Sequence, residues 1–174
     1  MDKQGDEMPV FNEKQGELVG KNGEDYVIMS AEALRRINRQ EEMMLGSGSF
    51  VIWYNAGKAV GRSDGQRYAP LMKSMEIEAF ATRIRDIYSR YGWGSIQFRD
   101  VDPKSGELVF WVKNSPLARG VRSKEPKCYF VRGFVEGMVS ELLGTEVVAV
   151  EVLCETVSGQ HCEFRLRWDG DGVK

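Results

Sequence analysis

Short segments with a two-residue periodicity in the second half of the chain place the strongest constraint on its fold. SIQFRDV (95–101) and ELVFWVK (107–113) flank the turn-forming stretch DPKSG, which predicts a β-hairpin. EVVAVEVLC (146–154) and CEFRLRW (162–168) predict two further strands, and the second alternates apolar and charged residues. Short strands joined in this way favour an antiparallel sheet of about four strands packed with helices, in the α+β class.

Four helices are predicted around these strands. Ser30 caps the first, which ends at the glycines of GSGS, and a second is expected over residues 50–61. SMEIEAFATRIRDIYSRYG (74–92) shows the clearest helical spacing of apolar residues, and KCYFVRGFVEGMVSELLG (127–144) predicts the last helix. A short strand is expected within EDYVIMS (24–30).

The chain divides into an arm and one domain. Residues 1–24 are polar, contain glycine and show no period, so we predict a flexible N-terminal arm. Residues 25–174 are predicted to form a single domain, because a chain of 174 residues with 42% apolar content can bury a core of useful size.

Composition argues against several classes of protein. The net charge of −2 leaves no basic footprint, so direct nucleic-acid binding is not expected. No apolar run approaches the ~20 residues that cross a bilayer, and the N-terminus lacks the apolar stretch of a signal peptide. We therefore expect a cytoplasmic protein without a membrane span. The odd number of three cysteines fits that reducing compartment.

Two of those cysteines and the only histidine lie in EVLCETVSGQHCEFRL (151–166). Cys154 and Cys162 close a strand–loop–strand element, and Cys128 lies at a predicted helix start, where the helix dipole would favour its thiolate. Glu151 precedes Cys154 by three positions, so strict alternation would place the two on opposite faces of the strand. Shared metal ligation therefore needs a bulge or a strand end near Cys154.

The residue types leave three interpretations of these cysteines open. Tetrahedral zinc accepts thiolates and a carboxylate, whereas buried free thiols explain the same residues without a metal and are favoured by spacing alone. A catalytic Cys–His pair is the weakest interpretation, because His161 is adjacent to Cys162 and neighbouring strand residues point apart. No catalytic residue is therefore predicted.

A family resemblance changes this balance. CYFVRGFVEGMVSELLGTEVVAVEVLCETVSGQHCEFRL resembles the C-terminal half of the 4-vinyl-reductase domain, a family that includes the sensory domains of phenol-responsive activators. The shared pattern is a cysteine opening a glycine-containing helix, a strand with Glu-x-x-Cys, and a loop with a final cysteine. VKNSPLA and YNAGKAVG resemble further segments of the family, so the likeness covers roughly residues 50–169.

The resemblance implies a zinc ion held by Cys128, Glu151, Cys154 and Cys162. A closed set of four ligands implies a structural zinc rather than a catalytic one. The implied fold is similar to that of the vesicle-tethering TRAPP subunits and the haem nitric-oxide-binding domains. Haem itself is not expected, because the family's histidine route to haem is not open to His161 within the cysteine loop.

The resemblance also implies a small apolar or aromatic ligand between the helices and the sheet. We expect a mostly apolar cavity of ~300–1,000 Å³, with Trp111 and Tyr129 as its favoured lining and Tyr54 and Phe134 as further candidates. Because an aromatic stripe is usually core, most aromatic residues here are expected to serve packing alone.

Glycine pairs and basic residues complete the expectations. Paired glycines in YNAGKAVG and in the 127–144 helix predict close helix contact, and a homodimer is expected. The basic residues of NSPLARGVRSKEPK (114–127) could attract an anion but are more often solvated, as are Arg35, Arg36 and Arg39.

Three functions remain open on this basis. The leading one is a zinc-containing sensor or carrier of a small molecule that signals through a separate protein partner. The second is an enzyme or accessory subunit in tetrapyrrole vinyl reduction, although no dinucleotide fingerprint is visible. The third is a scaffold similar to the TRAPP subunits. An enclosed apolar cavity favours the first, an open cleft with titratable groups the second, and a filled core with a large apolar surface the third.

Overall fold

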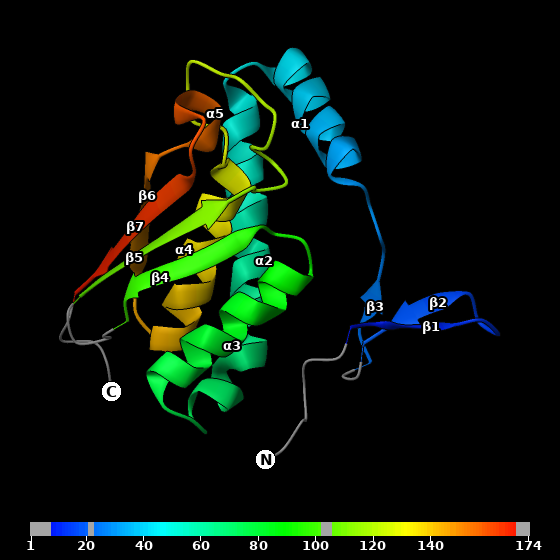
Figure 1. Ribbon diagram of the computed structural model, residues 1–174, viewed down its shortest axis with the longest axis vertical. Coiled ribbons are helices and arrows are strands. Elements are labelled where there is room, and N and C mark those ends of the chain that lie inside the picture. Colours follow the sequence, from blue (N-terminus) through cyan, green and yellow to red (C-terminus); the bar gives the residue numbers. More distant parts are fainter. Residues whose placement is uncertain (1–7, 21–22, 102–105, 170–174) are drawn as a thin grey trace.

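A four-stranded antiparallel sheet covered on one face by helices forms the body of the protein (Figure 1). The computed structural model describes residues 8–20, 23–101 and 106–169. The strands have the order β4-β5-β7-β6, so the last strand of the chain lies between two earlier ones. This is the predicted α+β class. The elements are β1 (Val10–Asn12), β2 (Glu17–Val19), β3 (Asp25–Tyr26), α1 (Ala31–Leu45), α2 (Gly48–Met72), α3 (Ile77–Arg90), β4 (Ser95–Asp100), β5 (Glu107–Lys113), α4 (Tyr129–Leu143), β6 (Val147–Leu153), α5 (Glu155–Ser158) and β7 (Cys162–Trp168).

The sheet follows the alternation seen in the sequence. In β7, Cys162, Phe164 and Leu166 are buried, while the charged residues between them lie on the other face. Phe164 is the register partner of Phe110 in β5, and their rings stack with centroids 5.0 Å apart. β4 and β5 pair as the predicted hairpin, although its turn residues 102–105 lie outside the described residues. The apolar face of the sheet is therefore the one that the helices cover.

Three helices match the predicted positions, and one is much longer than predicted. The Ser30 hydroxyl accepts a hydrogen bond from the Ala33 N–H at 3.1 Å and caps α1, as expected. Helix α3 buries the apolar face that includes Phe80 and Ile84, and α4 ends at Gly144 in a left-handed conformation. Helix α2 extends to Met72, because Pro70 lies in its last turn and does not break it.

Helices α2 and α4 touch backbone to backbone along the predicted glycine faces. A Cβ atom on Gly61 would lie 2.0 Å from the Phe134 carbonyl oxygen, and one on Gly133 would lie 2.0 Å from the Tyr54 carbonyl oxygen. Real Cβ atoms essentially never come so close, so only glycine allows this approach. The glycines thus serve packing within the chain.

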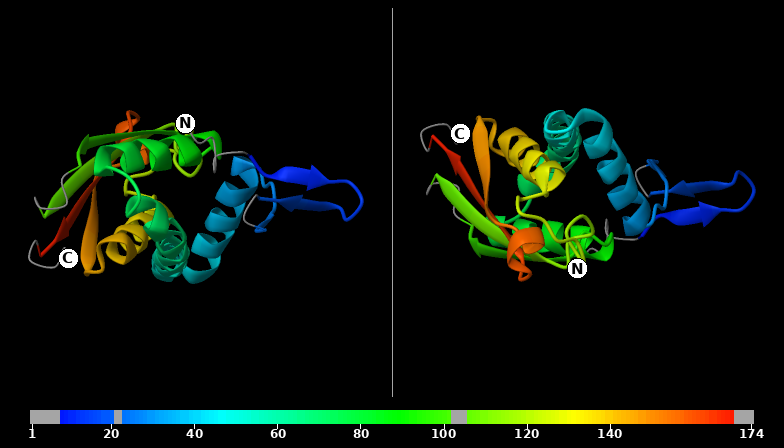
Figure 2. Two further views of the ribbon diagram at one scale, coloured as in Figure 1. Left: turned by 90° about the horizontal axis from the view of Figure 1, so that it is seen from below. Right: turned by 90° about the horizontal axis from the view of Figure 1, so that it is seen from above.

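The N-terminal segment differs from the expected irregular arm. β1, β2 and β3 form a three-stranded antiparallel sheet that extends away from the body (Figure 2). Residues 1–7 and 21–22 of the predicted arm lie outside the described residues. The strand expected within 24–30 is reduced to β3, whose Tyr26 packs edge-on against Tyr91 with ring centroids 5.9 Å apart. Such short strands carry too few residues for a period to show in the sequence.

Within the described ranges, none of the helices has the length and apolar character needed to cross a bilayer.

Candidate functional site

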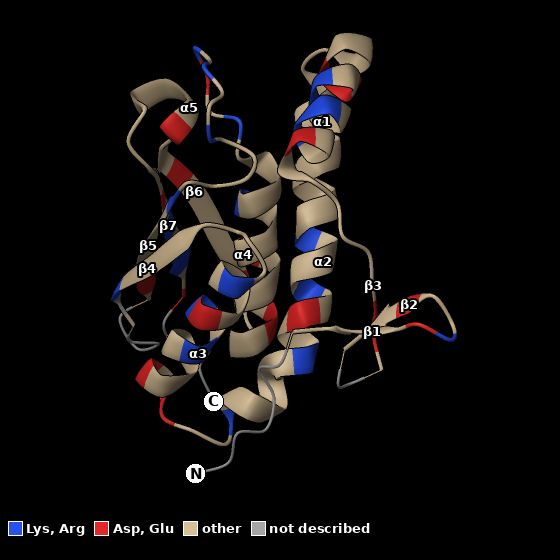
Figure 3. Cartoon of the chain, turned by 45° about the vertical axis from the view of Figure 1, so that its right-hand side comes forward, with Lys and Arg blue, Asp and Glu red and all other residues tan. Residues whose placement is uncertain are grey.

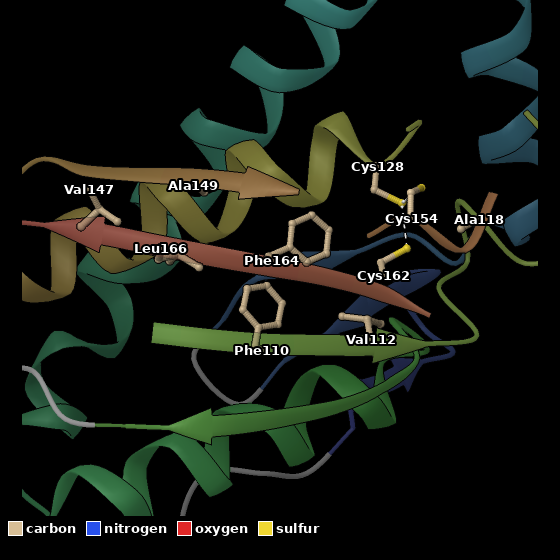
Figure 4. Packing of buried hydrophobic residues seen from close by; sticks show 10 residues of the cluster. All are labelled: Phe110, Val112, Ala118, Cys128, Val147, Ala149, Cys154, Cys162, Phe164 and Leu166. Atoms are coloured by element: carbon tan, nitrogen blue, oxygen red, sulfur yellow. Dashed lines mark hydrogen bonds between the residues drawn. The ribbon is translucent and has the colours of Figure 1, made fainter. Parts of the chain in front are cut away.

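The three cysteines and Glu151 come together in one cluster at the end of the sheet (Figure 4). The Sγ atom of Cys128 lies 3.4 Å from that of Cys162 and 3.9 Å from that of Cys154. Including a carboxylate oxygen of Glu151, the four potential ligand atoms all lie within 4.8 Å of one another. We call these four residues the cysteine cluster; all three of its thiols are buried and unbridged.

Four different elements place these side chains. Cys128 is the N-cap residue of α4, and Cys162 is the first residue of β7. Glu151 lies in β6, whose pairing with β7 shifts register between Glu151 and Leu153. This irregularity, followed by the end of the strand, brings Cys154 to the side on which Glu151 lies. The bulge or strand end that shared ligation requires is therefore present.

The geometry of the cluster fits a tetrahedral metal. Zn–S bonds of ~2.3 Å in a tetrahedron place two sulfur ligands ~3.8 Å apart, close to the separations found here. The Glu151 Oε1 atom is buried and has no hydrogen-bond partner among the described residues. A buried carboxylate oxygen without a partner is costly, and a cation among three thiols would remove that cost.

Without a metal, the cluster holds one proton-poor sulfur. A hydrogen bond to Cys154 raises the pKa of the Cys128 thiol, and the same contact lowers the pKa of Cys154. Burial raises the pKa of Glu151 to about 8. The direction for Cys128 differs from the expectation that the helix dipole would favour its thiolate, because neighbouring sulfurs act at shorter range than the dipole.

A large apolar cavity lies between the helices and the inner face of the sheet. Its volume is about 490 Å³, within the range expected from the sequence. The lining comes from α2, α3, α4 and the strands β4, β5 and β7, with Tyr26 of β3 at one side. Representative apolar lining residues are Phe80, Ile84, Phe98, Phe110, Phe134 and Met138. The second half of the chain thus encloses a space suited to a small apolar molecule.

A polar group interrupts this lining at one place. The Tyr88 hydroxyl donates to Asp64 Oδ2 at 2.5 Å, and Arg67 pairs with Asp64 at 3.0 Å and also with Glu24. Burial raises the pKa of Asp64. These side chains all belong to the cavity lining. They can orient a ligand that carries one polar atom.

Of the four residues predicted for ligand binding, only Phe134 lines this cavity. Trp111 lies on the outer face of the sheet, where its Nε1 donates to Oε1 of its cross-strand partner Gln97 at 2.7 Å. Its neighbour Phe110 takes the inward position, because adjacent strand residues point to opposite faces. The prediction that Trp111 lines the cavity is therefore wrong.

Tyr129 and Tyr54 also lie away from the cavity. The Tyr129 ring packs against Phe50 of α2, with centroids 5.5 Å apart. The Tyr54 hydroxyl donates to the buried carboxylate of Glu136, which belongs to the α2–α4 contact. Tyr129 was predicted as lining from its position beside Cys128, but the first turn of α4 faces α2 there.

The sequence analysis missed the polar group of the cavity. Asp64, Arg67 and Tyr88 belong to α2 and α3, and α2 was predicted to end at residue 61. A helix continued to Met72 places Asp64 and Arg67 one turn apart. The acid and the base at this spacing were the available signal.

Comparison with known proteins identifies the segment that carries the cluster. Residues 108–168 match the model of the vinyl-4-reductase (4VR) domain family. The matched segment runs from β5 to β7 and includes all four residues of the cysteine cluster. It confirms the predicted resemblance over this part of the chain. No curated protein sequence matches the chain.

Solved structures extend this likeness to the whole fold. The phenol-responsive sensory domain of the transcription activator PoxR, solved with phenol, has a TM-score of 0.78 at 19% identity, covering 92% of this chain and 84% of that one. A vinyl-4-reductase family protein from Methanocaldococcus jannaschii has a TM-score of 0.53 at 18% identity, covering 84% and 99% of the two chains. A trafficking protein particle complex subunit 3 from Naegleria fowleri, covalently bound to palmitic acid, has a TM-score of 0.56 at 14% identity, covering 80% and 95%. These likenesses show the fold, and the predicted similarity to the TRAPP subunits is confirmed at that level.

Proposed function

We propose that this protein is a sensor or carrier domain that binds a small apolar or aromatic compound in the cavity between helices and sheet. The observation that carries the proposal is the cavity of about 490 Å³ with its apolar lining. An enclosed space of this kind favours ligand binding over the enzymatic and scaffold alternatives. The PoxR sensory domain, solved with phenol, has the same fold and supports the choice of ligand class.

The polar group of the cavity narrows the ligand further. Tyr88, Asp64 and Arg67 are mutually hydrogen-bonded or paired, so their charges are largely compensated. A ligand hydroxyl could exchange hydrogen bonds with this group, whereas a second free charge would disturb it. The proposed ligand is therefore neutral and mostly apolar, with one hydroxyl or similar polar atom.

The proposed cofactor is one structural zinc ion held by Cys128, Glu151, Cys154 and Cys162. The sulfur separations and the buried, unpartnered Glu151 oxygen support it. When bound, zinc would join the start of α4 to the β6–β7 connection, and its binding free energy would become folding free energy. The chain's own residues supply the position and the burial of the ligand set.

The remaining parts of the proposal concern assembly and location. We propose a homodimer, supported by exposed apolar side chains at the end of α1 and the start of α2, among them Met43, Met44, Val51 and Ile52. Signalling would pass to a separate regulatory protein. A cytoplasmic location is supported by three thiols that remain unbridged.

Phenol and alkylphenols, titrated against the purified protein, test the ligand proposal. Trp93 and Trp168 line the cavity, so binding should change tryptophan fluorescence in a saturable way. Ala81→Leu places extra side-chain volume in the cavity and should weaken binding about tenfold or more. Ala56→Leu makes the same change on an exposed position of α2 and should leave affinity unaltered.

Two results would count against the proposal. One is an unchanged fluorescence signal across a broad panel of phenols, hydrocarbons and fatty alcohols. The other is equal affinity of the Ala81→Leu and Ala56→Leu variants, provided that both melt cooperatively. Native mass spectrometry of protein purified from its own host would report any retained ligand directly.

A further inference from the structure

A second cavity lies on the other side of the helices, next to the start of α4. Its volume is about 390 Å³, and it is formed by α1, the first turns of α2, and the segment from residue 117 to residue 130. This segment includes part of the basic stretch noted in the sequence. The wall is polar and charged, in contrast to the apolar cavity described above.

The charges of this wall are unbalanced. Its ionisable side chains are four cations, Arg35, Arg39, Arg122 and Lys127, and one carboxylate, Glu42. Figure 3 shows basic side chains both on α1 and on the segment between β5 and α4. Because one acid answers four bases, the wall carries a formal excess of positive charge.

Pairing inside the cavity leaves two guanidinium groups uncompensated. Lys127 pairs with Glu42. Arg35 pairs with Glu32 at 3.2 Å and donates to the Pro116 carbonyl oxygen at 2.7 Å. In the described part of the chain, no carboxylate pairs with Arg39 or Arg122. These two side chains come from different elements and meet only at this cavity.

An unused donor in the same wall points to an acceptor as the occupant. The Nε1–H of Trp53 is buried and lacks a hydrogen-bond partner among the described residues. The indole N–H can only donate, so its need is met by an acceptor such as an oxyanion. The Ser123 hydroxyl already accepts from the Glu125 N–H at 3.1 Å, which leaves its own proton free to donate.

We propose that this second cavity binds a small organic anion through its carboxylate or phosphate group. The guanidinium groups of Arg39 and Arg122 supply charge and paired donors, and the Trp53 indole supplies a neutral donor. Leu117, Val121 and Phe130 provide an apolar wall for the organic part of the molecule. The proposal does not depend on the ligand of the apolar cavity.

The position of this anion site relates it to both other features. The Arg122 guanidinium lies over Gly159, where an added Cβ would come within 2.6 Å of Nη1, and Gly159 lies in the loop between Cys154 and Cys162. Phe130 lines both cavities. Its ring meets Trp53 edge-on at 5.9 Å between centroids and stacks on Trp93 at 5.6 Å. Phe130 therefore separates the anion site from the apolar cavity.

NMR spectra of the indole N–H groups provide the test. The chain has four tryptophans, so a spectrum of the full-length ¹⁵N-labelled protein resolves few indole signals. Inorganic phosphate and acetate are titrated separately, with ionic strength held constant by chloride. We expect a saturable shift of the Trp53 signal with at least one of them, with a Kd of about 1 mM because each probe lacks the organic part. The stronger probe indicates whether a phosphate or a carboxylate is preferred.

Charge-matched variants separate a site from general attraction. Arg39→Gln combined with Arg122→Gln should weaken binding about tenfold or more. Arg36→Gln combined with Arg62→Gln removes the same charge from two exposed arginines outside the cavity and should leave the Kd unchanged. Trp53→Phe removes the indole donor and should weaken binding several-fold; acetate or phosphate binding is then followed by calorimetry.

The proposal is overturned if neither probe produces a saturable shift of Trp53. It is also overturned if the two double variants lose affinity equally, because the effect would then follow net charge alone. Melting curves are recorded for every variant. If the Arg39/Arg122 double variant does not fold, Arg122→Gln alone takes its place, and unchanged affinity in that variant and in Trp53→Phe refutes the site.

Discussion

Cys154 is the residue on which the cysteine cluster depends most. Its sulfur lies 3.9 Å from that of Cys128 and 3.1 Å from the Thr156 hydroxyl oxygen. Cys154→Ser replaces a thiolate ligand with a poor one, so the variant should lose zinc and melt at a lower temperature. Elemental analysis and calorimetry on the purified variant measure both effects.

His161→Ala is the matched control for this cluster. His161 lies in the same loop, but its ring packs edge-on against Trp111 and it is not part of the cluster. The variant should keep about one zinc per chain. Zinc loss in His161→Ala with retention in Cys154→Ser would show that the ligand set is wrong.

Glu136 is a second residue with a strong expected effect. It is 4% exposed, and it accepts hydrogen bonds from Lys58 at 2.8 Å, from the Ala149 N–H at 2.9 Å and from Tyr54. Burial alone would raise the pKa of Glu136, but the bonds from Lys58 and Tyr54 outweigh it and lower the pKa. Glu136→Gln should lower the free energy of unfolding by about 2 kcal/mol at neutral pH.

The pH dependence of this effect has a definite sign. A carboxyl with a lowered folded pKa stabilises the protein above its unfolded value near 4.5, and this stabilisation is lost as pH falls through the folded pKa. The difference between parent and Glu136→Gln should therefore shrink below about pH 4.5. Glu146→Gln, at an 81% exposed side chain paired with Arg62 at 3.6 Å, should change stability little at either pH. A difference that grows on acidification would contradict this account.

Sequence patterns predicted the cysteine cluster but not Glu136. Three cysteines in a cysteine-poor chain, with a glutamate at a matching position, form a signal that survives uncertainty in the strand ends. Glu136 lies on an otherwise apolar helix and is satisfied by Lys58 and Tyr54, which are distant in sequence. Such a partner set depends on how α2 lies on α4, and no local pattern reports that.

At the level of elements, the α2–α4 contact sets the geometry of the helical layer. Gly61→Ala would place a Cβ 2.0 Å from the Phe134 carbonyl oxygen, so the helices would have to move apart. We expect a loss of about 3 kcal/mol or more in the free energy of unfolding, measured by denaturant titration. Because Phe134 and Met138 line the apolar cavity, ligand binding should weaken as well.

Gly48→Ala is the control for that substitution. It lies at the start of the same helix, and its added Cβ would meet nothing closer than Leu45 Cβ at 3.9 Å. Stability should stay within about 0.5 kcal/mol of the parent. If Gly61→Ala were as stable as Gly48→Ala, the close approach of the helices would be refuted.

Strand pairs were predictable from the sequence, whereas strand faces were only partly so. Alternation in CEFRLRW identifies the buried face of β7 without ambiguity. In β5, Phe110 and Trp111 are both aromatic, so alternation shows that one faces inward but not which one. The register that pairs Phe110 with Phe164 decides it, and register is a property of the assembled sheet. The very short strands β1 to β3 offered no period at all.

At the level of the whole molecule, exposed apolar side chains predict self-association. Met44 and Val51 are 73% and 46% exposed on neighbouring ends of α1 and α2. Met44→Glu combined with Val51→Glu should convert the proposed dimer to a monomer, as measured by light scattering after size-exclusion chromatography. Val148→Glu, on the edge strand β6 away from this surface, should leave the mass unchanged. A parent protein that is monomeric at all concentrations would refute the dimer.

Phe130 has a consequence for how the molecule responds to mixtures. Its ring is a common wall of the apolar cavity and the anion site, so each occupant changes the surroundings of the other. Thermodynamic linkage makes any such influence reciprocal. The factor by which a bound anion alters affinity for the apolar compound equals the factor by which that compound alters affinity for the anion. A protein divided by one aromatic ring in this way measures the joint presence of two chemically unlike compounds, and its response to either depends on the concentration of the other.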